Sequence, residues 1–87
     1  MSQTKNEILK LLSQYISMLC DLHENEIDFN LDLIEERLVD SIKANDVLAY
    51  IEETFNLALE EEHIFDRRFV SINGMAEVIM EILSNKS

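Results

Sequence analysis

A serine lies directly after an aspartate at the start of a predicted helix, within the segment Leu38-Val39-Asp40-Ser41-Ile42. The first backbone N–H groups of a helix lack intrahelical partners and carry partial positive charge. A phosphate attached to the Ser41 hydroxyl would therefore be stabilised at this position. Asp40 or Ser41 could equally be a simple helix cap, and spacing alone favours that interpretation because both residue types are common caps.

The sequence near Ser41 lacks the partners of a catalytic serine. A serine nucleophile needs a His or Lys base and an oxyanion hole. His23 and His63 are distant in the chain, and Lys43 is two residues on, a spacing at which helical side chains do not face each other. Both histidines lack a Cys or His at metal-ligand spacing and are predicted to lie on the surface. We therefore predict that the protein is not an enzyme and has no catalytic residues.

Asp28, Asn30 and Asp32 imitate the first ligands of a calcium-binding EF-hand loop. Continuing the count, Leu33 occupies the position that needs glycine for a sharp turn. Val39 occupies the position that needs a bidentate glutamate. Two essential positions fail, so the sequence predicts no metal site.

The chain is strongly acidic, with a formal net charge of −11. This charge disfavours nucleic acid, because phosphates are bound through Lys and Arg. It also disfavours an anionic membrane surface. It favours basic protein partners that are met rapidly and in a salt-sensitive way.

The compartment is predicted from cysteine usage and hydropathy. Cys20 is the chain's single cysteine, so it cannot form an internal disulfide, which is compatible with a reducing cytoplasm. We predict a buried, unreactive thiol. No apolar run approaches the roughly 20 residues that span a bilayer. The expected location is cytoplasmic, without membrane insertion.

Composition and periodicity predict an all-α chain that forms one domain over residues 1–87. One glycine and no proline favour helices over a turn-rich β fold. The connection 21–39 is long, and its apolar residues should pin it across the helices, with a short turn around Leu33–Arg37. The expected fold is a small four-helix bundle with a long first loop and a short third helix. The predicted long helices are residues 4–20, 41–56 and 71–84, with Thr4, Asp40 or Ser41, and Ser71 as candidate N-caps. Residues 63–69 should contain a short third helix or turn.

Hydrophobic residues at helical spacing predict the core. Ser13 and Ser17 are predicted to lie mostly off the apolar stripe of the first helix, and Gly74 to permit a close helix contact. The methionines Met18, Met75 and Met80 are predicted to be core or boundary filler. The residues predicted to pack inward include Ile8, Leu12, Tyr15, Ile16, Leu19, Ile27, Phe29, Leu33, Ile34, Val47, Ile51, Phe55, Leu59, Ile64, Phe65, Phe69, Ile72, Ala76 and Ile79.

The second helix should present an outward stripe. Asp46, Ala49, Tyr50 and Glu53 follow one another at i, i+3, i+4 and i+7 and so share a face. Such an acidic stripe is commonly just a solvated surface. It is also the kind of surface on which a basic protein would dock.

Four segments in order carry a resemblance to a known family. Asp40-Ser41-Ile42 precedes an acidic helix, Leu33-Ile34-Glu35-Glu36 leads into it, and Glu52-Glu53-Thr54-Phe55 closes that helix. Asp66-Arg67-Arg68-Phe69-Val70-Ser71-Ile72 precedes the last helix. Together, over roughly residues 5–83, they resemble the acyl carrier protein family.

The resemblance implies a carrier that holds an acyl or aminoacyl intermediate as a thioester on a 4′-phosphopantetheine arm attached to Ser41. Asp40 would help to position the metal and coenzyme of the phosphopantetheinyl transferase. The partners implied are this transferase, an acyl- or aminoacyl-loading ligase, and downstream synthases or transferases with basic docking patches. The carrier is expected to be a monomer in fatty-acid-like or secondary-metabolite synthesis. The docking residues implied by matching positions are Ile42, Asp46, Ala49, Glu52 and Glu53.

Three residues depart from the family pattern. Arg37 takes a place often held by glycine, Lys43 one often held by an acid or small residue, and Asn45 one that is often apolar. These departures are compatible with a specialised carrier, and the cargo can be acyl, aminoacyl or D-alanyl. The alternative is a non-enzymatic acidic helical module that binds a basic protein partner without being modified.

Overall fold

The computed structural model describes residues 4–23 and 27–85. The helical spacing of apolar residues in the sequence matches the helices found there. Those residues form four α-helices and one 3-10 helix and contain no strand. The prediction of an all-helical chain is confirmed. The radius of gyration is 12.0 Å, which is the value of about 12 Å expected for a folded chain of this length. The elements are α1 (Lys5–Leu19), α2 (Ser41–Phe55), α3 (Glu61–Ile64), η2 (Arg67–Val70) and α4 (Ile72–Ser84).

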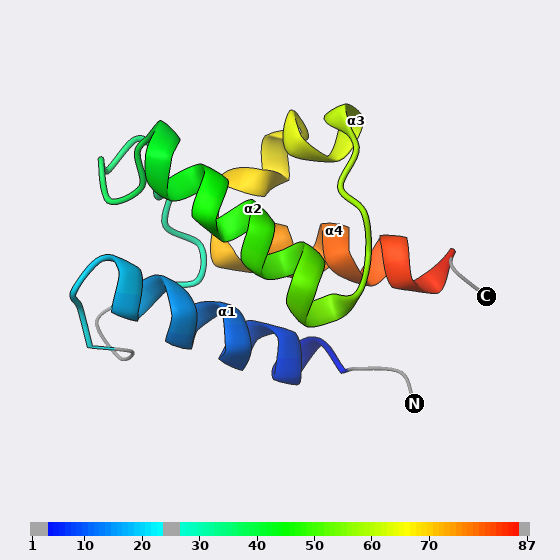
Figure 1. Cartoon of the computed structure of the whole chain (residues 1–87). Coiled ribbons are helices and arrows are strands. Elements are labelled where there is room, and N and C mark those ends of the chain that lie inside the picture. The colour runs from blue at the N-terminus through cyan, green and yellow to red at the C-terminus, as the bar shows by residue number, and fades with distance from the viewer. Residues whose placement is uncertain (1–3, 24–26, 86–87) are drawn as a thin grey trace.

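The three long helices surround the core (Figure 1). α1 and α2 run in opposite directions, and α4 packs against both α1 and η2. In the view of Figure 1, α3 lies on the side of α2 that is away from α1. No described helix is long and apolar enough to cross a membrane. The predicted core is confirmed in its centre, which is formed by Ile8, Leu12 and Ile16 of α1, Val47 and Ile51 of α2, and Ile72, Ala76 and Ile79 of α4, all buried.

Side-chain caps start the long helices where the sequence predicted them. Thr4 accepts a hydrogen bond from the backbone N–H of Glu7 at 3.2 Å, and Ser71 accepts one from Gly74 at 3.0 Å. These bonds satisfy N–H groups that have no partner within the helix. The predicted boundaries of α1, α2 and α4 are therefore right to within one residue.

The third helix is short, as predicted, but it begins before the predicted segment 63–69, and a separate 3-10 helix follows it. α3 starts at Glu61, because the backbone N–H of Glu60 donates to Nδ1 of His63 at 3.1 Å. Asp66 then starts a separate helix by accepting a hydrogen bond from the N–H of Arg68 at 2.9 Å. Phe65 lies at this break and is 81% exposed, so its predicted role as a core anchor is wrong.

The buried face of α1 is wider than the predicted stripe. Ser13 and Ser17 are buried, contrary to expectation, because α2 and α4 both pack against this helix. The Ser13 hydroxyl donates to the carbonyl of Lys10 at 2.9 Å. Met18, predicted to be a filler residue, is instead 69% exposed.

The long connection between α1 and α2 is held onto the C-terminal half of the chain. Leu33 is buried, and its N–H donates to the Val70 carbonyl at 2.9 Å. The N–H of Asn73 donates to the Phe29 carbonyl at 2.8 Å. The predicted turn over residues 33–37 is confirmed. The predicted inward packing of Phe29 and Ile34 is wrong, since both side chains are exposed.

Candidate functional site

Ser41 is the first residue of α2 and is exposed. Asp40, not Ser41, is the cap: its Oδ1 accepts from the Lys43 N–H at 2.9 Å, and its carbonyl accepts from the Ala44 N–H at 2.8 Å. Because Asp40 performs the capping, the helix does not need the Ser41 hydroxyl for its own start. The arrangement leaves an alcohol in the first turn of a helix, beside backbone donors and partial positive charge.

An apolar cavity of about 100 Å³ lies beside this helix start. Two of its lining residues, Val39 and Ala44, flank Ser41 in the sequence, so the cavity and the hydroxyl share one end of α2. The lining comes from five segments and contains aliphatic, aromatic and thioether side chains alone. It includes Leu33, Ile34 and Val39 of the connection, Ala44, Val47 and Leu48 of α2, Ile64 of α3, Phe69 and Val70 of η2, and Met75 of α4.

The segment that precedes Ser41 is fixed at several points. The Cys20 thiol donates to the Leu38 carbonyl at 3.2 Å, and the Val39 N–H donates to the Leu33 carbonyl at 3.1 Å. Arg37 has a φ of 61°, in the left-handed region where glycine is preferred. Burial raises the pKa of the half-buried Cys20 thiol, and nearby Lys43 acts in the opposite direction. The predicted unreactive thiol is consistent with this raised pKa, since the thiolate is the nucleophile.

The docking residues expected on α2 fall into two groups. Ile42 is 73% exposed, and Asp46, Ala49 and Glu53 are exposed along the same helix. Glu52 is exposed too, but its Oε2 accepts a hydrogen bond from the Leu59 N–H at 2.8 Å. The Glu52 carboxylate thus holds the connection that leads to α3.

Tyr50 does not belong to the outward stripe in which it was predicted. Its ring stacks on that of Tyr15 with centroids 4.0 Å apart, and its hydroxyl donates to the Leu11 carbonyl at 3.2 Å. The Tyr15 hydroxyl donates to the Asp46 carbonyl at 3.4 Å. The pair therefore joins α1 to α2.

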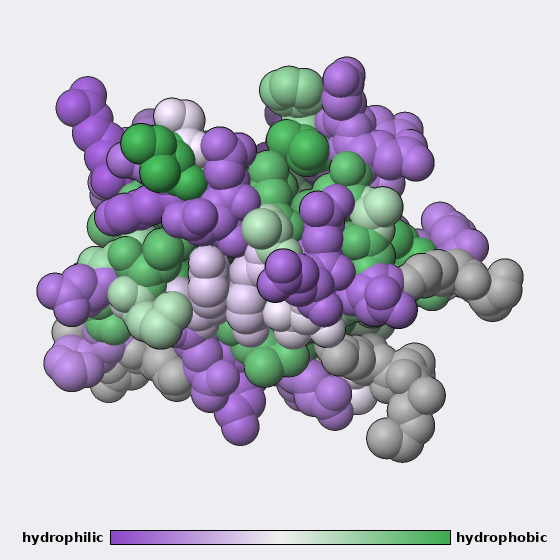
Figure 2. Space-filling view, in the orientation of Figure 1, coloured by the Kyte–Doolittle hydropathy of each residue, from purple (hydrophilic) through white to green (hydrophobic). Residues whose placement is uncertain are grey.

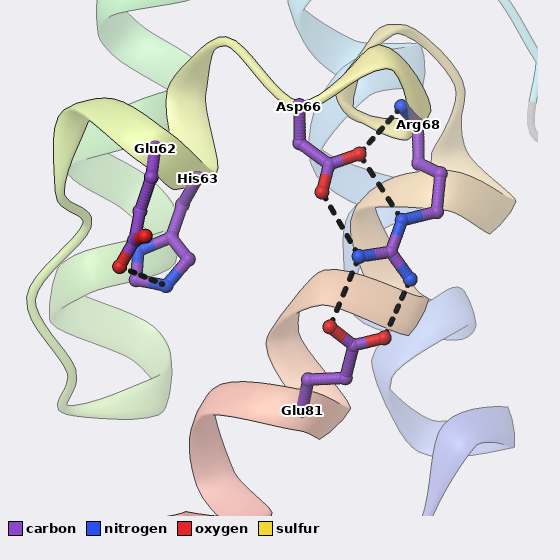
Figure 3. Close-up of polar contacts among 5 residues, drawn as sticks. All are labelled: Glu62, His63, Asp66, Arg68 and Glu81. Carbon is purple, nitrogen blue, oxygen red and sulfur yellow. Dashed lines mark hydrogen bonds and ion pairs between the residues drawn. The ribbon is translucent and has the colours of Figure 1, made fainter.

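Ion pairs hold the α3–η2 side of the cavity onto α4 (Figure 3). The Arg68 guanidinium contacts the carboxylate of Asp66, with Nη2 2.9 Å from Oδ2, and that of Glu81, with Nη2 3.0 Å from Oε1. Hydrogen bonds from Arg68 lower the pKa of Asp66 to about 2 and also lower the pKa of Glu81. Because η2 contributes Phe69 and Val70 to the lining, this network fixes one wall of the cavity.

The residues considered as metal ligands have other contacts. Oδ1 of Asp28 accepts from the Asn30 N–H, and Oδ1 of Asp32 accepts from the N–H groups of Ile34 and Glu35. Within residues 4–23 and 27–85, no group of three or more His, Cys, Asp or Glu side chains is placed to hold a metal ion.

The two histidines differ in their exposure. His23 is exposed, as predicted. His63 also reaches the surface but is half-buried, with Nε2 3.9 Å from Oε1 of Glu62.

Sequence reasoning missed two exposed residues near the cavity, Ile34 and Phe65. Phe65 precedes Phe69 by four residues, a spacing that places two side chains on one face only within a continuous helix. Asp66 was the available signal against that interpretation, because an Asp that caps a new turn interrupts the helical period. Ile34 carried no such signal in the sequence.

No family model, curated protein or solved structure matches this chain. Its function must therefore be inferred from its own residues and their geometry, together with the motif resemblance.

Proposed function

We propose that this chain is a carrier protein that bears a 4′-phosphopantetheine arm on Ser41. The observation that carries the proposal is the exposed Ser41 hydroxyl in the first turn of α2, at the same end of the helix as an apolar cavity. When attached, the arm supplies a thiol that holds an acyl group as a thioester. The chain itself performs no catalysis in this proposal, and presents the group to partner enzymes.

The residues around Ser41 fit an attached phosphate ester. The backbone N–H groups of the first turn of α2 favour negative charge. Asp40 is exposed, so its carboxylate is accessible to the metal and coenzyme of a phosphopantetheinyl transferase while Oδ1 caps the helix. Arg37 has the left-handed backbone that suits the glycine often found at that place in the resembling family.

The cavity favours an apolar acyl cargo over an aminoacyl or D-alanyl one. Its lining offers no charged partner for an ammonium group, and burying an unpaired charge is costly. A cavity of about 100 Å³ is smaller than the roughly 150 Å³ site that accommodates benzene in another protein. A short apolar chain is therefore the cargo that fits without rearrangement.

The resemblance also implies a finer architecture and a setting. We propose that α1, α2 and α4 with the short α3 form a four-helix bundle, and that residues 1–87 are one domain. We propose a cytoplasmic, monomeric carrier in fatty-acid-like or secondary-metabolite synthesis. Its partners would be the transferase, a loading ligase and downstream synthases or transferases, whose basic patches would meet the acids of α2.

A second candidate is an acidic helical module that binds a basic protein without being modified. The net charge of −11 and the exposed Asp46 and Glu53 support it. Salt-sensitive binding to a basic partner fits both proposals. Covalent modification of Ser41 is expected for the carrier alone and therefore distinguishes the two proposals.

The test is intact mass after incubation with coenzyme A, Mg²⁺ and a promiscuous phosphopantetheinyl transferase. We expect the wild type to gain one phosphopantetheine unit and Ser41→Ala to gain none. Asp40→Asn, which keeps an oxygen for the helix cap, should be modified slowly yet remain folded. No gain in the wild type, with a transferase proven active on another carrier, would favour the binding module.

A further inference from the structure

The hydrogen bond that starts α3 depends on the protonation state of a histidine. The backbone N–H of Glu60 donates to Nδ1 of His63 at 3.1 Å. Nδ1 accepts a hydrogen bond only in the neutral imidazole, because both ring nitrogens of the charged form are donors. The bond between Glu60 and His63 is therefore present when the ring is neutral and is lost when the ring is protonated.

α3 has little besides this cap to hold it in a helical form. It is four residues long, and none of its residues is buried. Figure 2 shows hydrophilic atoms exposed around the position of α3, where Glu61 and Glu62 face solvent. Because short helices are marginal without tertiary packing, one cap hydrogen bond has a large effect on whether α3 forms.

The two ends of α3 are held more firmly than α3 itself. On the side of α2, the Leu59 N–H donates to Oε2 of Glu52 at 2.8 Å. On the side of η2, the carboxylate of Asp66 accepts hydrogen bonds from both the backbone and the guanidinium of Arg68. Loss of the cap would therefore displace residues 60–65 while both flanking segments stay in place.

The charges around His63 attract its protonated ring away from the cap (Figure 3). Oε1 of Glu62 is 3.9 Å from Nε2, the nitrogen that does not face the cap, and Asp66 and Glu81 interact electrostatically with the ring. Arg68 is already paired with Asp66 and Glu81. Its hydrogen bonds lower the pKa of both carboxyl groups, so they stay charged at the weakly acidic pH at which an imidazole gains its proton. The carboxylates of the segments around α3 are Glu52 of α2, Glu62 of α3, Asp66 before η2 and Glu81 of α4.

The residue that follows His63 connects the cap to the cavity beside Ser41. Ile64 lines this cavity together with residues of α2, η2 and α4. The Ile64 N–H donates to the Glu60 carbonyl at 3.1 Å, within the same helical turn that the cap starts. Release of the cap would therefore move the part of the cavity wall that α3 contributes.

We propose that His63 is a pH switch for the cavity: the neutral ring holds α3 in place, and the protonated ring releases α3, so that Ile64 leaves the cavity wall. An imidazole ordinarily gains its proton between about pH 8 and about pH 5. The cavity is thus closed by Ile64 at neutral pH and opens in weak acid. The switch goes beyond the proposed carrier function, because it is a property of the unmodified chain.

The test measures amide protection by NMR in the unmodified full chain at about pH 7.5 and about pH 5.5. Protection factors, which correct for the intrinsic pH dependence of exchange, are compared at Ile64 and Phe65, whose N–H groups donate to carbonyls within the turn. We expect both to fall about fivefold in acid, the effect of losing one cap hydrogen bond. The Ile64 methyl shifts should change with the same midpoint as the His63 ring, while the amides of α4 keep their protection.

His63→Gln separates the switch from other effects of pH. Glutamine accepts a hydrogen bond at this capping position and does not titrate, so protection in this variant should change less than about twofold between the two pH values. His23→Gln is the matched control, since His23 is the other histidine and is exposed near the end of α1. It should respond to acid as the wild type does.

Several results would overturn the inference. These are unchanged protection in the wild type, an equal acid response in the wild type and His63→Gln, and loss of the response in His23→Gln. A fall in amide protection without a change in the Ile64 methyl shifts would do so as well, because the cavity wall would not have moved. None of these measurements uses a transferase, so the switch and the carrier function are tested independently.

Discussion

The backbone carbonyl oxygen of Arg68 lies against Gly74, so close that a Cβ on residue 74 would overlap with it. The neighbour is backbone and cannot turn aside as a flexible side chain could. η2 packs on the first turns of α4 because position 74 has no side chain. The close helix contact predicted for Gly74 is therefore present, between α4 and η2.

Gly74→Ala should destabilise the fold although alanine favours helices. Overpacking typically costs about 1–3 kcal/mol, which should outweigh a propensity gain of about 1 kcal/mol. We expect a net loss of about 1 kcal/mol in the free energy of unfolding, measured with urea. Ser84→Ala, an exposed change near the end of the same helix, should stay within about 0.5 kcal/mol. A Gly74→Ala variant as stable as the wild type would contradict the close packing.

Glu52 and Glu53 are adjacent acids on α2 with different structural roles. The Glu52 carboxylate accepts from the Leu59 N–H, so Glu52→Ala should cost about 1 kcal/mol of stability. Amide hydrogen exchange should accelerate in the connection and in α3. Glu53→Ala should leave the stability and the amide exchange rates near their wild-type values. It should weaken the binding of a basic protein partner. Equal exchange rates in the two variants would show that the hydrogen bond does not hold the connection.

The ion pairs of Arg68 predict a loss of stability in acid. Hydrogen bonds from Arg68 hold the pKa of Asp66 at about 2, below its ordinary value of 3.8. A depressed pKa stabilises the fold at pH values above about 4, and that contribution is lost as pH falls towards 2. In urea unfolding, Asp66→Asn should be less stable than the wild type at pH 7, and the difference should shrink below pH 4. Adding Asp66→Asn to Arg68→Ala should produce little further pH-dependent change.

Ser17 has a buried hydroxyl, and Oγ has no hydrogen-bond partner among the described residues. A buried polar group without a partner is costly, and alanine has the higher helix propensity. Ser17→Ala should therefore raise the free energy of unfolding by about 1 kcal/mol. Ser13→Ala is the matched comparison, since the Ser13 hydroxyl is bonded to Lys10. Thermal unfolding of both variants measures the difference, and an equal gain would contradict the distinction.

Local chemistry made the long helices predictable from the sequence. Helical spacing of apolar residues, with Thr4, Asp40 and Ser71 as caps, determined where α1, α2 and α4 begin. These features act over three or four residues, so the sequence displays them directly. The local pattern left Asp40 and Ser41 both open as the cap of α2, and the structure assigns the cap to Asp40 and leaves Ser41 exposed.

Long-range packing decided what periodicity could not. α1 has neighbours on two sides, which buries Ser13 and Ser17 as well as its apolar stripe. The capping at Asp66 divides α3 from η2 and turns Phe65 outward.

The candidate site depends both on local sequence and on long-range packing. Sequence alone identified Ser41, Asp40 and the acids of α2, because they depend on residue type and on position in a single helix. The cavity depends on segments that are distant in the chain, and the hydrogen bond between Glu52 and Leu59 depends on how the connection after α2 folds back. Which side chains are buried there depends on which surfaces meet in the folded molecule. The residue pattern of a single helix does not contain that information.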